Sequence, residues 1–245
     1  INKEIAEYYL IRGFSYMKNV DYKLALKDFE KSINLNSKLK DAYLNIGVIY
    51  SELKKFDQSI NYLSKVIDID PNDKRAYSNL AQIRSEMNEY EKALDEINKS
   101  IRLDPNNLNS YLLRGNFYKE LKMFDLSLSD FEKVIFESKK NNNYELYYDA
   151  LYNKSLLKLL LGDFDEGWNL YEHRFNIHIH KEFEKFKKEK IFSKITKKNI
   201  PFPQNIKDLK NSNLLIISEQ GIGEHIIFLP LISEASKLAK SITVL

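Results

Sequence analysis

The sequence predicts a mainly α-helical protein, an α-solenoid of helix–turn–helix repeats followed by the truncated start of an α/β domain. Three observations predict this architecture. A pattern of tyrosine, small and large apolar residues recurs every 34 residues in the N-terminal part of the chain. Glycine and proline are scarce, with 7 and 5 of the 245 residues, so long helices are expected. Close to the C-terminus, two short β-branched runs flank a glycine-containing turn and a helical pattern.

The repeat appears in four aligned segments of the sequence. In-phase tyrosines are Tyr9, Tyr43, Tyr77 and Tyr111. Small residues follow at Gly13, Gly47, Ala81 and Gly115, and again at Ala25, Ser59, Ala93 and Ser127. Large apolar residues come next, at Phe29, Leu63, Ile97 and Phe131. Each unit therefore predicts two amphipathic helices that approach closely at the small residues. One unit alone cannot bury its apolar face, so the units must stack.

These offsets resemble the tetratricopeptide repeat family, which implies a right-handed superhelix over residues 1–175. Units are expected at about 6–39, 40–73, 74–107 and 108–141, and Asp-Pro closes two of them, at Asp70 and Asp104. A fifth unit at 148–175 follows an apparent six-residue insertion in "SKKNNNYELYY". Its turn, Gly162-Asp163-Phe164, matches the turn Asn88-Glu89-Tyr90 of an earlier unit.

The resemblance implies a concave groove that is lined by the first helix of each unit and takes a protein or peptide partner. Residues at the sixth position look inward in this family; here they are Ile11, Asn45, Asn79, Leu113 and Asn153. The three asparagines resemble the asparagine ladder of O-linked N-acetylglucosamine transferase. A side-chain amide both donates and accepts hydrogen bonds, so a row of them could clamp an extended peptide backbone. Alternatively, these asparagines are solvated or bonded to neighbouring helices. Other expected groove residues are Leu10, Phe14, Leu44, Val48, Gln82, Asn116 and Lys119.

Composition limits the partners and the compartment. A net charge of +3 does not demand nucleic acid, and no apolar run is long enough for a membrane span. Without cysteine there is no thiolate metal site, and a reducing, cytoplasmic location is expected. His173, His178 and His180 lack further ligands nearby, so no metal site is expected. The expected groove residues include no cluster of lysine and arginine, which disfavours a partner that binds through its C-terminal carboxylate. The oligomeric state stays open.

A basic linker is expected at residues 176–211. Its segment "KEFEKFKKEKIFSKITKK", Lys181–Lys198, alternates lysine with phenylalanine. A solvated helix or linker is the favoured interpretation, and an anionic-surface or nucleic-acid patch is the alternative. The prolines of "NIPFPQ", Asn199–Gln204, then enforce extended backbone, which places a domain boundary here.

Residues 212–245 predict the first βαβ portion of an α/β domain. The run "NLLIIS" precedes a turn with Gly221 and Gly223, and "SITVL" begins another strand. The turn is not a dinucleotide fingerprint, because the third glycine position holds Ile226. It is not a simple phosphate cradle either, because Glu219 and Glu224 flank it and would repel a phosphate.

A second resemblance covers residues 162–245. "GDFDEGWNLYEHRF" and "LLIISEQGIGEHIIFLPLI" are similar to the junction of bacterial repeat proteins fused to a heptosyltransferase-type, GT-B glycosyltransferase domain. The resemblance implies Glu224 as general base, where the family has aspartate, and a nucleotide sugar as cofactor of the full-length protein. Both ends of the sequence look cut, and one βα unit cannot hold the active site, so this chain alone is expected to bind no cofactor and to be inactive. The alternative is a pure protein-interaction module with a degenerate, non-catalytic α/β domain.

Overall fold

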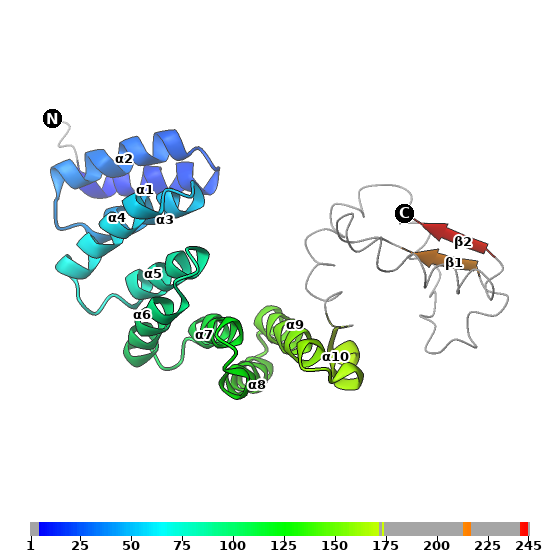
Figure 1. Ribbon diagram of the computed structural model, residues 1–245. Helices are drawn as coiled ribbons and strands as arrows, with labels where there is room; N and C mark the ends of the chain where they lie inside the picture. The colour runs from blue at the N-terminus through cyan, green and yellow to red at the C-terminus, as the bar shows by residue number, and fades with distance from the viewer. Residues whose placement is uncertain (1–4, 172, 174–212, 217–240, 245) are drawn as a thin grey trace. The chain divides into compact units, whose positions relative to one another are not determined.

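The computed structural model of the chain describes residues 5–171, 173, 213–216 and 241–244 (Figure 1). The chain divides into two compact units, Ile1–Lys181 and Glu182–Leu245. The expected basic linker at 176–211, the glycine turn at Gly221 and Gly223, and the candidate base Glu224 lie outside the described residues.

The N-terminal unit is a stack of helix pairs, as the repeat predicts (Figure 1). Its described helices are α1 (Ala6–Lys18), α2 (Tyr22–Leu35), α3 (Lys40–Glu52), α4 (Phe56–Ile69), α5 (Lys74–Glu86), α6 (Tyr90–Leu103), α7 (Leu108–Glu120), α8 (Phe124–Lys140), α9 (Tyr144–Leu160) and α10 (Phe164–Tyr171). The first helices of the first four pairs begin at residues 6, 40, 74 and 108, which reproduces the 34-residue period. The predicted α-solenoid is therefore confirmed.

Within each pair, the turn between the two helices contains one residue in the left-handed backbone conformation. Its φ is 62° at Val20, 58° at Lys54, 60° at Asn88, 59° at Lys122 and 80° at Gly162. The next N–H then bonds back to the first helix, as from Asp21 to the Tyr16 carbonyl at 2.9 Å. This bond satisfies a carbonyl that the helix end leaves without an intrahelical partner. Glycine usually fills this position, but four of these five turns hold another residue there.

Between pairs, an aspartate or asparagine side chain ends the second helix. Asp70 Oδ1 accepts from the Asn72 N–H at 3.0 Å, and Asp104 Oδ1 accepts from the Asn106 N–H at 3.2 Å. Proline follows each aspartate and cannot continue the helix. The corresponding position in the fourth repeat is Ser138, which is followed by Lys139 rather than by proline, and α8 continues through it to Lys140.

Because no proline ends α8 at this position, the fourth unit is longer and the fifth unit begins earlier than predicted. The six-residue insertion is not a loop: α8 has 17 residues where α6 has 14, and α9 has 17 where α7 has 13. The fifth unit therefore begins at Tyr144 rather than at residue 148. Both helices gain about one turn, and Asn142 with φ 55° makes the tight connection between them.

The small residues of the repeat are required by the packing of each pair. A Cβ added at Gly13 would lie 2.8 Å from Phe29 Cε1, and one added at Gly115 would lie 2.6 Å from Phe131 Cε1. Both phenylalanine side chains are fully buried. Core clusters then join successive pairs; one contains Phe29 and Ile46 from neighbouring units. This packing matches the predicted stacking of units that share their apolar faces.

In the C-terminal unit, two described strands pair in parallel. They are β1 (Asn213–Ile216) and β2 (Ser241–Val244), with Asn213 opposite Ser241 and Ile216 opposite Val244. Both strands fall within the apolar runs that predicted them. Parallel neighbours require a crossover connection, and that segment lies outside the described residues, so the Rossmann-like domain stays a prediction.

Candidate functional site

The first helices of the repeats line the inner side of the solenoid. Successive first helices, α1, α3, α5, α7 and α9, approach one another more closely than successive second helices do. A stack in which one layer is packed more tightly curves toward that layer. We call the exposed and half-buried residues of the first helices the groove, since the repeat resemblance predicts a concave surface on this side.

The groove asparagines are oriented by their own helices. Asn45 Nδ2 donates to the Asp41 carbonyl at 2.8 Å, and Asn153 Nδ2 donates to the Asp149 carbonyl at 2.8 Å. Each bond reaches back one helical turn. It uses one N–H of the amide, and the amide oxygen and the second N–H take no part in it. Asn79 is half-buried like Asn45 and Asn153. These bonds to the parent helix differ from both expected alternatives, solvation and bonding to a neighbouring helix.

The other expected groove residues fall into three groups. Ile11 and Phe14 are exposed, at 68% and 44%, and Gln82 is exposed as well. The half-buried residues are Leu10, Val48, Leu113, Asn116 and Lys119. Leu44 is only 7% exposed and packs into the core cluster of Leu63 and Leu80, which removes it from the surface that a ligand touches.

Asn116 differs from the oriented asparagines. Its Oδ1 is buried and has no hydrogen-bond partner among the residues that the structure describes. The atom faces protein rather than the open groove, and an unpartnered buried acceptor costs about 1–3 kcal/mol. Asn116 is thus a weaker candidate for ligand contact than Asn45 or Asn79.

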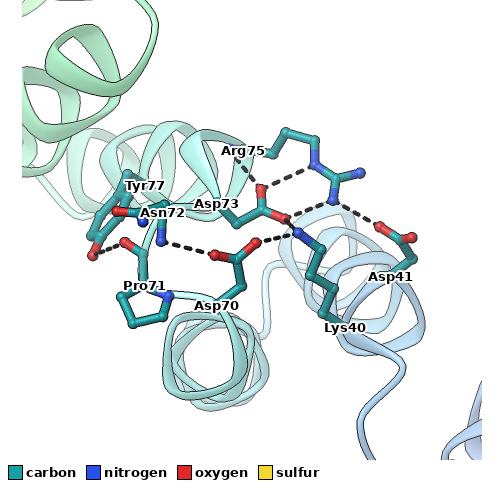
Figure 2. Close-up of polar contacts among 8 residues, drawn as sticks. All are labelled: Lys40, Asp41, Asp70, Pro71, Asn72, Asp73, Arg75 and Tyr77. Carbon is teal, nitrogen blue, oxygen red and sulfur yellow. Dashed lines mark hydrogen bonds and ion pairs between the residues drawn. The ribbon is translucent and has the colours of Figure 1, made fainter.

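An ion-pair network, which sequence reasoning missed, joins the second and third repeats (Figure 2). Lys40 at the start of α3 pairs with Asp70 and, at 3.0 Å, with Asp73. Arg75 Nη2 donates to Asp73 at 2.6 Å and to Asp41 at 2.7 Å. The network ties α3 to the α4–α5 loop and to the first turn of α5.

Asp73 is the centre of this network. Its side chain is 3% exposed, and its Oδ1 accepts from the Arg75 backbone N–H at 3.0 Å, which caps α5. Burial alone would raise the pKa of Asp73, but hydrogen bonds from Arg75 and Lys40 lower this pKa far below its usual range. The bond to Asp70 likewise raises the pKa of Lys40. Asp73 therefore stays ionised, in a network of two cations and three carboxylates.

A sequence signal for the network did exist. Lys40 and Lys74 are 34 residues apart, and so are Asp70 and Asp104. Lys74 Nζ lies 2.5 Å from Asp104 Oδ2, so the pairing recurs one repeat later. A charge that recurs at the repeat period together with an opposite charge indicates a repeated ion pair.

A second polar pair recurs three repeats apart. Arg12 donates to Asp28 at 2.6 and 2.7 Å, and Arg114 donates to Asp130 at 2.8 Å through two nitrogens. Arg114 also donates to Asn98 Oδ1 at 2.8 Å, which joins it to the preceding repeat. The equivalent positions in the two middle repeats hold buried Ile46 and Leu80. These arginines are engaged in structural bonds within the solenoid.

In the last described repeat, carboxylates form ion pairs with the two lysines of α9. Lys154 lies 3.0 Å from Glu132 and 3.0 Å from Glu166. Lys158 lies 2.6 Å from Glu166 and 3.0 Å from Asp163. Lys154 and Lys158 are thus each paired with two carboxylates of the same chain.

The described residues contain no His, Cys, Asp and Glu group suited to a metal ion, and none of the helices described is long and apolar enough to cross a membrane. His173 stacks on Tyr148 with ring centroids 5.9 Å apart, whereas His178 and His180 lie outside the described part of the chain.

Comparisons with known proteins agree with the repeat structure. Family models described as tetratricopeptide repeat match residues 6–39, 41–73, 62–95 and 108–135. No curated protein matches the chain.

Several solved structures share the fold. A MamA crystal structure is 19% identical with a TM-score of 0.57, covering 69% of this chain and 96% of that one. Pseudomonas aeruginosa pilF is 16% identical with a TM-score of 0.59, covering 77% and 84%. YrrB, "a TPR protein with an unusual peptide-binding site", is 18% identical with a TM-score of 0.55, covering 77% and 94%. The chain therefore contains tetratricopeptide repeats, which build a mainly α-helical solenoid.

Proposed function

We propose that this chain is a protein-interaction scaffold that holds an extended peptide in the groove. The observation that carries the proposal is the pair of half-buried asparagines, Asn45 and Asn79, at the same inward position of adjacent first helices. The structural likeness to YrrB, which is described as a TPR protein with an unusual peptide-binding site, supports the same function.

The chemistry of the groove fits a peptide backbone. A backbone presents N–H donors and carbonyl acceptors in alternation, and a carboxamide bonds to both. Because Asn45 Nδ2 is fixed by the Asp41 carbonyl, its amide is oriented before a ligand arrives. Such preorganisation lowers the entropic cost of binding.

The spacing of the repeats also suits an extended chain. Packed helices lie about 8–10 Å apart, and an extended peptide rises about 3.3 Å per residue. One repeat therefore spans about three peptide residues, so successive asparagines meet the backbone at regular intervals. Recognition through the backbone does not require a particular side-chain sequence.

The test is a paired substitution in the whole chain. Linear peptides are selected from a random displayed library, and their affinity is measured by fluorescence anisotropy. We expect Asn45→Ala with Asn79→Ala to weaken binding about tenfold or more, since each lost hydrogen bond is worth about 1 kcal/mol. The matched control is Asn34→Ala with Asn61→Ala, which changes exposed asparagines on the second helices α2 and α4. Equal losses in both pairs would refute the groove.

The finer part of the proposal is that the scaffold presents its ligand to a glycosyltransferase-like domain that begins near residue 212. The sequence similarity of Glu219–Gly223 supports it, and so does the parallel pairing of β1 and β2. In this proposal Glu224 is the general base and a nucleotide sugar is the cofactor of the full-length protein. The competing function is a pure interaction module with a non-catalytic α/β domain.

Thermal melting of the full-length protein with nucleotide sugars separates these two functions. A rise in the melting temperature with an ADP- or UDP-linked sugar supports glycosyl transfer, because a ligand that binds the folded state stabilises it. No shift with any donor favours the pure interaction module.

A further inference from the structure

We propose that the last described repeat binds an amphipathic helix of a partner protein, which packs there as the first helix of a further repeat would. The site consists of Phe164 and Trp168 on α10, and we call it the end face. It is separate from the groove, and the proposal does not depend on the function proposed for the groove.

The end face occupies positions that are covered in the earlier repeats. Phe164 is the first residue of its second helix, and the residues that begin the other second helices are Tyr22, Phe56, Tyr90 and Phe124. Four residues later come Leu26, Ile60, Leu94, Leu128 and, in the last repeat, Trp168. The members from the first four repeats are all half-buried, whereas Phe164 is 59% exposed and Trp168 is 49% exposed. The last repeat therefore exposes an aromatic surface at a place where each earlier repeat is packed.

In the earlier repeats, this surface is covered by the first helix of the next repeat. Phe56 and Ile60, for example, pack against the core cluster that contains Ala76 and Ile83 of α5. The corresponding pairs of the first and third repeats pack against clusters that contain residues of α3 and α7. A second helix contacts the next first helix far more than it contacts the next second helix. The end face therefore matches a helix of the first kind rather than another copy of α10.

The four first helices that cover such a surface share a sequence pattern. A small residue is followed seven positions later by a large apolar residue, and the pairs are Ala42 with Ile49, Ala76 with Ile83, Ser110 with Phe117, and Ala150 with Leu157. All of these residues are buried. Positions seven apart lie on one face of a helix, so the small residue permits close approach and the apolar residue fills the contact. This pattern defines the chemistry of the partner helix.

The free first helix of a second copy does not carry this pattern. In α1 the same two positions hold Tyr8, which is 57% exposed, and Ser15, which is exposed as well. Tyrosine would hold the helices apart where alanine lets them approach, and serine supplies no apolar side chain. The two ends of the repeat stack therefore differ, and only the end face has the character of a repeat interface. Exposed apolar surface of this kind marks interaction sites.

The experiment uses the fluorescence of the whole chain. Trp168 is the only tryptophan among its 245 residues, so its emission reports on the end face directly. The probe is a peptide with the sequence of α5, Lys74–Glu86, extended by alanine-rich turns because so short a helix is marginal in water. We expect the peptide to shift the Trp168 emission to the blue and to reduce its quenching by acrylamide.

Two controls test the pattern and the site. A peptide with Ala76→Tyr and Ile83→Ser, which copies the residues of α1, should bind about tenfold more weakly or worse, since it loses the burial of an apolar side chain. In the chain, Phe164→Ser should weaken binding of the α5 peptide about tenfold while Trp168 still reports. The matched variant is Phe136→Ser on α8, where Phe136 is 68% exposed, and its binding should not change. Circular dichroism should show the same helix content in all variants.

Three results would overturn the proposal. Trp168 emission that is already blue-shifted and protected in the chain alone, at every concentration, would show that the same chain covers the end face. Protection that grows with the concentration of the chain would assign the end face to a second copy. Equal affinity for the two peptides, or no change in Trp168 emission on adding the α5 peptide, would show that the end face does not bind a helix of this pattern.

Discussion

The close approach of Gly115 and Phe131 makes a quantitative prediction about how the repeats pack. In Gly115→Ala, the new Cβ would lie 2.6 Å from Phe131 Cε1 and 2.9 Å from Cδ1. Carbon atoms prefer about 3.5–4.0 Å, so the ring must move by about 1 Å, and its site is fully buried. Such overpacking costs about 1–3 kcal/mol, against a helix-propensity gain from alanine of about 1 kcal/mol. We expect a net loss of up to about 2 kcal/mol in the free energy of unfolding.

The chain supplies its own compensating variant. In the third repeat the same two positions hold Ala81 and Ile97, and both are fully buried in one core cluster. Gly115→Ala combined with Phe131→Ile copies that pair into the fourth repeat. We expect the double variant to be more stable than the sum of its single losses, by about 1 kcal/mol in urea unfolding followed by circular dichroism. A stabilising Gly115→Ala, or strictly additive losses in the double variant, would refute this account of the packing.

Three further predictions concern the turns and the polar network. Val20 has φ 62°, which a β-branched residue rarely adopts, so Val20→Gly should raise the free energy of unfolding by about 0.5–1 kcal/mol; a decrease in urea unfolding would contradict strain at this turn. The pKa of Asp73 is depressed in the folded state, so its stabilisation is present above the unfolded pKa of about 3.9 and is lost as the pH falls further. Asp73→Asn should therefore flatten the loss of stability below about pH 4, and an unchanged acid profile would exclude this role. Arg114→Leu should lose about 3 kcal/mol in urea unfolding because it leaves buried Asp130 unpaired, and a loss close to zero would show that the pair is dispensable.

Much of the solenoid was predictable because its period is a property of the residues. The in-phase tyrosines and small residues predict the helix pairs, and Asp-Pro at residues 70–71 and 104–105 marks the ends of α4 and α6. The two short β-branched runs likewise predict β1 and β2. In each case a local feature of the sequence acts on its own neighbours.

The features that sequence reasoning missed depend on contacts between distant residues. An insertion of six residues does not say whether it forms a loop or lengthens two helices, and only the packing of α8 on α9 decides this. Leu44 was expected in the groove because of its position in the helix, but the neighbouring repeat buries it. The network around Asp73 joins residues from two repeats, and its signal lies in the joint recurrence of two charges rather than in one motif.

A crystal structure of the chain with a selected peptide tests the central claim most directly. The groove predicts that the peptide runs along the first helices, with backbone atoms within hydrogen-bond distance of the side-chain amides of Asn45 and Asn79. A peptide bound instead to the second helices, or held through its carboxylate by Lys40 or Arg75, would contradict the account.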